Sequence, residues 1–148
     1  MTALILAIDC GNSRLKWGLH GSAGWRAQGK LDYAGLQGFA EQLRAQPRAD
    51  RVVAVNVAGP LVGEAVAAAV AALGIPQHWV KSQSAQYGVR NLYDHPEQLG
   101  ADRWAALIGA VDEERHAAVA AKLRQQTIDA AAWRDKCLGY FAQFSKQP

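Results

Sequence analysis

Cysteine is scarce in this sequence, and its placement excludes the structures that depend on it. The two cysteines, Cys10 and Cys137, lie far apart in the chain. A disulfide framework needs several cysteines at regular spacings, and a zinc site needs ligand pairs a few residues apart. The sequence has neither pattern, so reduced thiols in a cytoplasm are the simpler expectation.

Long hydrophobic runs are also missing. No stretch approaches the roughly 18 consecutive apolar residues that a membrane-spanning helix needs. The apolar start of the chain has no basic region before it and no small-residue cleavage site, and Asp9 ends it, so it does not fit a signal peptide. We expect a soluble, cytoplasmic protein without a membrane partner.

A dense block of basic charge is likewise missing. The formal net charge is +3, and the 16 Lys and Arg residues are scattered along the chain. A nucleic-acid interface needs basic residues gathered on one face, so the sequence argues against nucleic acid as a partner. The chain has 148 residues, of which 50% are hydrophobic. This length and composition suffice to bury the hydrophobic core of one domain and to add an appendage.

The hydrophobic pattern of the first 81 residues predicts an α/β fold. The continuous apolar run Leu4–Ile8 is typical of a central strand buried on both faces, and Arg14–Leu19 alternates with a period of two. The order of elements is three strands, helix, strand, helix, strand, which predicts a mixed five-stranded sheet with flanking helices, built from an antiparallel meander and a strand-helix-strand crossover. The further strands are expected at Trp25–Leu31, Arg51–Val57 and Gln77–Lys81, and the helices at Tyr33–Gln46 and Leu61–Leu73.

The alternation of predicted strands and helices ends after residue 81. Ser82–Leu99 is a long polar loop, and Gly100–Ala110 has the spacing of a helix. From residue 112 the composition shifts to Ala, Gln, Arg and Lys, which predicts a helical C-terminal tail over 112–148 after a lobe of residues 1–111. An apolar stripe on that tail is expected to pack against protein surface or to mediate self-association, and it consists of Trp133, Cys137, Tyr140, Phe141 and Phe144.

A tight turn between the first two expected strands is the first candidate site. Gly11 can take positive φ and Asn12 tolerates it, so the backbone N–H groups of the turn can point into one concavity that binds anions. Ser13 adds a hydroxyl, Lys16 a positive charge, and Asp9 a carboxylate suited to hold Mg²⁺ directly or through water. The alternative is an ordinary hairpin in which the glycine and asparagine serve only the turn.

The segment YDHPEQLGADRW, residues 93–104, is the second candidate site. Asp102 falls in the first turn of a helix, where the helix dipole keeps a carboxylate ionised, and such a group can accept a proton from a substrate hydroxyl that attacks a phosphate. Arg103 offers a bidentate fork for a substrate carboxylate. The alternative is a plain helix-start acid beside a solvated arginine.

Three segments together resemble a known family. They are DCGNSRLKWGL at residues 9–19, VNVAGP at 55–60 and GVRNLYDHPEQLGADRWAALIGA at 88–110. All three are similar to type III pantothenate kinase, a family of the actin-like ATPase superfamily with a ribonuclease H-like fold. The resemblance covers roughly the first three quarters of the chain and implies ATP-dependent phosphorylation of pantothenate, the first step towards coenzyme A.

The resemblance also implies roles for residues and ligands. It implies an ATP phosphate loop made of Asp9, Cys10, Gly11, Asn12, Ser13, Arg14, Leu15 and Lys16. It implies a pantothenate site made of Tyr93, Gly100, Ala101, Asp102 and Arg103, with Asp102 as the catalytic proton acceptor. Members of the family are homodimers and need a monovalent cation, K⁺ or NH₄⁺. They use ATP with Mg²⁺, and in this chain Asp9 is the residue expected to hold that Mg²⁺.

The sequence departs from the family after Ala110. The family continues into a second lobe opened by an Asp-Ala-Gly-Thr-Ala type strand, which supplies the monovalent-cation ligand, and residues 111–148 contain no such run. Positioning supplies most of the catalysis in phosphoryl transfer, so we expect little or no kinase activity from this chain alone. The alternative function is a non-catalytic binding or transcription accessory protein derived from this family.

Overall fold

A computed structural model describes residues 3–112 of the chain. They belong to two compact units, one ending at Val80 and the other beginning at Lys81, and each is described by itself. The predicted helical tail, with its stripe, lies outside the described residues, so the predicted boundary after residue 111 stays a prediction. None of the helices in the described part of the chain has the length and apolar composition that crossing a membrane requires.

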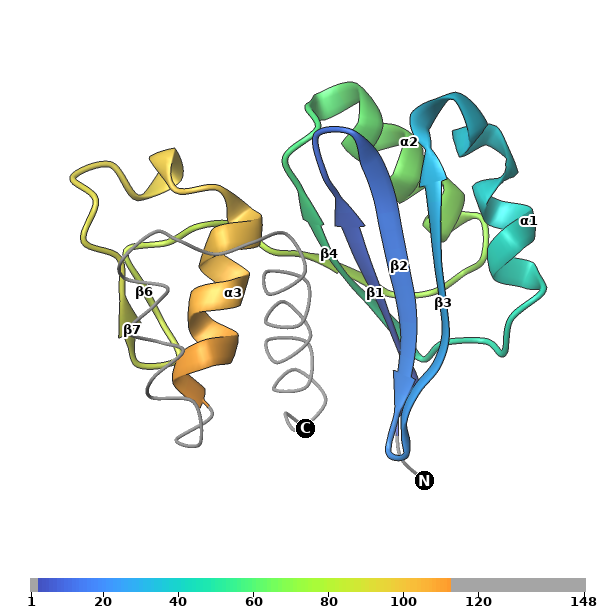
Figure 1. Cartoon of the computed structure of the whole chain (residues 1–148), viewed down its shortest axis with the longest axis horizontal. Coiled ribbons are helices and arrows are strands. Elements are labelled where there is room, and N and C mark those ends of the chain that lie inside the picture. The colour runs from blue at the N-terminus through green and yellow to red at the C-terminus, as the bar shows by residue number, and fades with distance from the viewer. Residues whose placement is uncertain (1–2, 113–148) are drawn as a thin grey trace. The chain divides into compact units, whose positions relative to one another are not determined.

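A five-stranded mixed sheet forms the first unit (Figure 1). Its strand order is β3-β2-β1-β4-β5; β1, β2 and β3 pair antiparallel, and β4 runs parallel to both β1 and β5. The predicted meander and crossover are therefore confirmed. The strands are β1 (Ile5–Cys10), β2 (Arg14–Gly21), β3 (Gly24–Asp32), β4 (Arg51–Asn56) and β5 (Gln77–Trp79).

Strands β1 and β4 lie at the centre of this sheet and are apolar on both faces. Leu6 and Ile8 of β1 belong to the same buried core cluster as Val52 and Ala54 of β4. The residues that alternate with them are buried as well, which confirms the predicted central strand; they are Ile5, Ala7, Val53 and Val55. Because neighbouring strands enclose β1 on both sides, its carboxyl end, where the first candidate site begins, is held firmly.

Strand β3 forms one edge of the sheet. Its side chains alternate, since Leu31 is buried while its neighbours in sequence, Lys30 and Asp32, are exposed. Arg26 and Gln28 continue the exposed series along the strand. The edge therefore carries a row of polar and charged side chains over most of its length.

The predicted helix over Tyr33–Gln46 is wrong in its first half. The structure has a 3₁₀ helix, η1 (Tyr33–Gly38), and only then an α-helix, α1 (Phe39–Arg44). Glycines at 35 and 38 explain the difference, because glycine in a helix interior costs about 1 kcal/mol relative to alanine. The second predicted helix is present as α2 (Pro60–Ala71). Helices α1 and α2 contribute Phe39, Leu43, Val66 and Val70 to the core cluster.

The second unit contains more regular structure than its polar sequence predicts. A short hairpin, β6 (Ala85–Gln86) and β7 (Val89–Arg90), lies within the segment expected to be a loop, followed by the 3₁₀ helix η2 (Pro96–Gln98). The two residues of its turn, Tyr87 and Gly88, have φ values of 49° and 78°, as a two-residue primed turn requires. The predicted final helix is present as α3 (Ala101–Asp112).

Candidate functional site

The turn between β1 and β2, residues 11–13, forms the first candidate site, which we call the phosphate turn. The N–H of Gly11 donates to the carbonyl of Arg14 at 3.2 Å and closes it. Asn12 and Ser13 are exposed, and neither backbone N–H donates a hydrogen bond to the part of the chain that the structure describes. Adjacent backbone donors of this kind suit an anion.

The expected positive φ in the phosphate turn is wrong. The described residues with positive φ are Tyr87 and four glycines elsewhere in the chain, and Gly11 and Asn12 are not among them. Three residues connect the strands, so the two-residue hairpin that demands positive φ at both central positions does not form. Space around Gly11 is limited instead, because a Cβ there would lie 3.2 Å from the carbonyl oxygen of Arg14, a tight contact.

Opposite charges lie next to each other at the base of the phosphate turn. Asp9 and Lys16 are register partners on β1 and β2, and Lys16 is the partner of Lys30 on β3, so the three share one face of the sheet. The described residues contain no group of three or more His, Cys, Asp or Glu that could hold a metal by themselves. A single carboxylate beside a phosphate site nevertheless fits Mg²⁺, which takes one or two carboxylates plus phosphate oxygens and water.

Cys10 contributes its backbone to the site. It is fully buried, and its carbonyl accepts a hydrogen bond from the N–H of Val57 at 2.9 Å. Burial, and then the charge of Asp9, raises the pKa of the Cys10 thiol to about 12. The thiol is protonated at neutral pH and is no nucleophile there.

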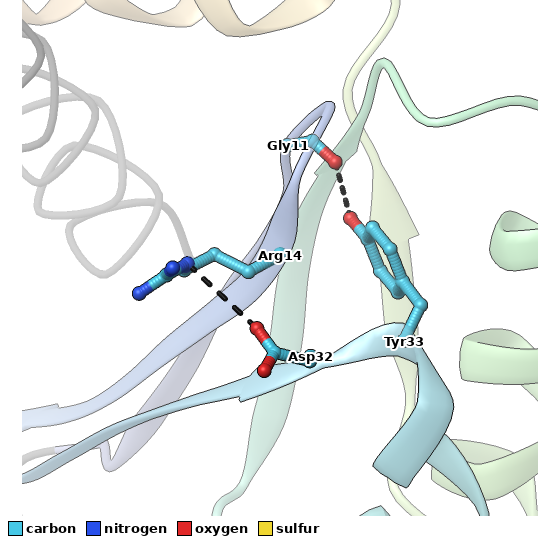
Figure 2. Close-up of polar contacts among 4 residues, drawn as sticks. All are labelled: Gly11, Arg14, Asp32 and Tyr33. Carbon is cyan, nitrogen blue, oxygen red and sulfur yellow. Dashed lines mark hydrogen bonds and ion pairs between the residues drawn. The ribbon is translucent and has the colours of Figure 1, made fainter.

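Two residues that the sequence did not point to, Asp32 at the end of β3 and Tyr33 directly after it, contact Arg14 and the phosphate turn. The Tyr33 hydroxyl donates to the Gly11 carbonyl, and the Arg14 Nε lies 3.9 Å from the Asp32 Oδ1 (Figure 2). Burial, and then the charges of Cys10 and Asp9, raises the pKa of Tyr33 to about 12. The sole sequence signal was a tyrosine placed directly after a strand.

Asn56 organises a second turn beside the first. It ends β4 and is the register partner of Cys10, so the carboxyl ends of β1 and β4 meet at one edge of the sheet. Its amide Nδ2 donates to the Gly59 carbonyl at 2.8 Å, and its Oδ1 accepts from the Ala58 N–H at 2.9 Å. The VNVAGP segment thus lies next to the phosphate turn, and α2 begins at Pro60 within it.

The second candidate site lies at the start of α3. Asp102 is in the first turn of the helix, as predicted, and its Oδ1 accepts the N–H of Arg103 at 2.8 Å. Arg103 is exposed, whereas Trp104 is fully buried and its Nε1 donates to the Gln86 Oε1 at 2.9 Å. This contact anchors the start of the helix on the β6–β7 hairpin and leaves Arg103 in solvent.

Tyr93 lies on the loop that leads to this helix, and 42% of it is exposed. Asn91, which the sequence did not indicate, holds the loop: its Oδ1 accepts the Tyr93 N–H at 3.1 Å and its Nδ2 donates to the Pro96 carbonyl at 3.2 Å. Ser82 closes the base of the loop through a hydrogen bond to the Leu99 carbonyl. The loop is therefore fixed by its own side chains.

The predicted site residues fall into two groups. Residues 9–16 lie together on the phosphate turn and its two strands in the first unit. Tyr93 and residues 100–103 lie in the second unit, on the loop and at the start of α3. Their roles in binding ATP and pantothenate stay predictions.

Both groups fall within a match to a known family. The family model described as type III pantothenate kinase matches residues 5–123. The chain belongs to the type III pantothenate kinase family. This result confirms the resemblance found in the sequence, and the five-stranded sheet agrees with the expected actin-like lobe.

Individual members of the type III pantothenate kinase family are similar to this chain over most of its length. A protein of that name from Aromatoleum aromaticum is 46% identical over 107 residues, which are 72% of this chain and 44% of the relative. One from Azoarcus sp. is 43% identical over 109 residues, 72% of this chain and 41% of the relative. One from Nitrosospira multiformis is 38% identical over 140 residues, 94% of this chain and 53% of the relative. The chain therefore spans about half the length of the curated relatives it matches.

Proposed function

We propose that this chain is the ATP-binding and pantothenate-binding part of a type III pantothenate kinase, which transfers the γ-phosphoryl group of ATP to the primary hydroxyl of pantothenate. The observation that carries the proposal is the family match over residues 5–123, because that range includes both candidate sites. The names of the relatives support the substrate pair.

The phosphate turn is the proposed ATP site. The backbone N–H groups of the exposed residues Asn12 and Ser13 would bind phosphate oxygens, with Lys16 adding positive charge on the same face of the sheet as Asp9. Asp9 would hold the Mg²⁺ that accompanies the nucleotide, directly or through water, and the metal would neutralise the charge that develops on the phosphates.

Asp102 is the proposed proton acceptor. Asp102 lies in the first turn of α3, and a carboxylate there can take the proton of the pantothenate hydroxyl as that oxygen attacks the γ-phosphorus. The P–O bond to ADP breaks as the new P–O bond forms, so ADP leaves and the proton stays on Asp102. Arg103 would pair with the pantothenate carboxylate, and Tyr93 would line the same site.

Several parts of the proposal depend on sequence that this chain does not contain. The monovalent cation, K⁺ or NH₄⁺, would be bound by the second lobe typical of the family, because residues 111–148 contain no Asp-Ala-Gly-Thr-Ala type run. The complete protein is proposed to be a cytoplasmic homodimer. One lobe can contact the phosphates from one side alone, so turnover is expected from the two-lobed form.

The test is a substitution of the proposed proton acceptor in a complete two-lobed form that carries these residues. Asp102→Asn keeps the size of the side chain and removes its basicity, so kcat should fall by about 10²- to 10⁴-fold while the Kd for ATP stays unchanged. Asp94→Asn, at an exposed position on the same loop, is the matched control and should retain activity. Retained turnover in Asp102→Asn would remove this residue from the mechanism, and a wild-type protein that makes no phosphopantothenate would overturn the proposal.

A second candidate is a non-catalytic binding or regulatory protein, such as a transcription accessory factor. The observation in its favour is that the chain spans only 41–53% of the relatives' length. Calorimetric titration of the chain with ATP and with pantothenate distinguishes the two. Binding without turnover supports this candidate if no second lobe complements the chain. A chain that binds neither ATP nor pantothenate would count against both candidate functions.

A further inference from the structure

The orientation of one peptide plane decides how well the phosphate turn can bind an anion. The carbonyl of Gly11 and the N–H of Asn12 belong to the same planar unit, and in a trans peptide these groups point in opposite directions. The described residues contain no cis peptide bond. If the plane rotated, the carbonyl oxygen would replace the N–H as the group facing a phosphate, and a donor would become a source of repulsion. Glycine makes such a rotation easy because it has no Cβ.

The side chain of Tyr33 fixes this plane from outside the phosphate turn. Its hydroxyl donates a hydrogen bond to the Gly11 carbonyl from 22 positions along the chain, and Figure 2 shows the ring reaching the carbonyl from the start of η1. Because the carbonyl points to Tyr33, the N–H of Asn12 points away from it. A carbonyl that accepts a hydrogen bond also polarises the N–H of its own peptide, which makes that N–H a better donor.

Among the contacts described at the phosphate turn, the hydrogen bond from Tyr33 is the one that fixes the Gly11–Asn12 peptide plane. The ion pair between Arg14 and Asp32 spans 3.9 Å, and its side chains are 45% and 79% exposed, so it contributes little to the order of the turn. The hydrogen bond from Gly11 N–H to the Arg14 carbonyl fixes the peptide before Gly11, not the one after it. The raised pKa of Tyr33 means that its hydroxyl remains a donor throughout the neutral range.

We propose that Tyr33 is a positioning residue for the polyphosphate of a nucleoside triphosphate: its hydroxyl holds the Gly11–Asn12 peptide with the Asn12 N–H available to the phosphates. Tyr33 touches no substrate and acts through the backbone of the phosphate turn. The inference rests on the proposed function, since a turn that binds no polyphosphate has no need of this orientation.

The experiment compares the 148-residue chain with its Tyr33→Phe variant, which loses one hydroxyl and keeps the ring. Each ¹⁵N-labelled protein is titrated with inorganic tripolyphosphate and with ATP while amide resonances are followed by NMR. In the wild type, the resonances of Asn12 and Ser13 should shift on binding. In Tyr33→Phe the Kd should rise about fivefold, the effect of one net hydrogen bond, and the Asn12 shift should shrink selectively.

Tyr87→Phe, in the β6–β7 turn, is the matched control and should bind like the wild type. A merely structural role for Tyr33 would lower the Tm and move many resonances, without singling out Asn12. If wild type and Tyr33→Phe bind tripolyphosphate with the same Kd, the inference is overturned and the proposed function stands. If the wild type binds neither ligand, the ATP part of the proposed function fails and the inference falls with it.

A Tyr33→Phe variant that does not fold still leaves a decisive measurement on the wild type. Tripolyphosphate should then shift the amide protons of Asn12 and Ser13 together, while that of Gly11, already bonded to Arg14, moves little. A wild-type chain that binds tripolyphosphate without any shift at Asn12 would overturn the inference.

Discussion

Cys10 and Tyr33 are two acids whose protonated forms the fold favours. The pKa of Cys10 rises from 9.0 to about 12 and that of Tyr33 from 10.0 to about 12, in both cases chiefly through burial. The unfolded chain therefore releases these protons at a lower pH than the folded chain does. Across this window the unfolded state binds fewer protons, so the free energy of unfolding falls as pH rises.

The resulting prediction concerns alkaline stability. The free energy of unfolding contributed by Cys10 should be fully present below pH 9 and should be lost progressively up to about pH 12. Urea titrations at several pH values should show this loss, and a Cys10→Ala variant should show a shallower decline whatever its stability at pH 7. An equal slope in the variant would mean that Cys10 is not the group that titrates.

At the scale of elements, the β4–α2 connection depends on one side chain packed against a glycine. A Cβ at Gly63 would lie 2.5 Å from the Nδ2 of Asn56. Two hydrogen bonds, to Gly59 and from Ala58, hold that amide in place. The amide would have to give up these bonds to make room, so Gly63 and Asn56 are energetically coupled.

A double-mutant cycle measures this coupling. Gly63→Ala should cost more stability in the wild type than in an Asn56→Ala background, with a coupling energy of about 1 kcal/mol. Gly35→Ala is the control, because a Cβ at Gly35 meets no heavy atom within 4 Å, and its effect should be the same in both backgrounds. Additive effects of Gly63→Ala and Asn56→Ala in chemical denaturation would contradict the packing described.

The elements that the sequence predicted well are those whose pattern reports directly on burial. The apolar runs of β1 and β4 indicated central strands, and these strands are buried on both faces. The 3₁₀ geometry of η1 was predicted wrongly as α-helix, because Leu36, Phe39 and Leu43 keep an α-helical spacing that conceals the cost of the intervening glycines. Strands of two residues, such as β6 and β7, are too short to show any period.

The candidate site was predictable as far as it is local in sequence. The phosphate turn and the first turn of α3 each occupy one short segment, and both are found where the motifs placed them. The hydrogen bond from Tyr33 to Gly11 and the register of Asn56 against Cys10 depend on strands that bring distant residues together. No spacing rule within the sequence specifies such contacts before the sheet is known.

At the scale of the whole molecule, the chain spans about half the length of the curated relatives it matches. We therefore expect the 148-residue chain, with ATP, Mg²⁺, K⁺ and pantothenate, to make no detectable phosphopantothenate. The full-length relative from Aromatoleum aromaticum, assayed alongside, is the positive control. Turnover by the chain alone would show that residues 1–148 carry a complete active site.

The polar edge of β3 affects how the molecule behaves in a crowded solution. In the part of the chain that the structure describes, β3 has nine residues and pairs with β2 alone, and the free side of an edge strand can take up a further strand from another chain. Arg26, Lys30 and Asp32 place charges along this edge, and a second copy docking there would have to desolvate them. The same strand that ends beside the phosphate turn thus carries charges that disfavour strand addition at this edge of the sheet.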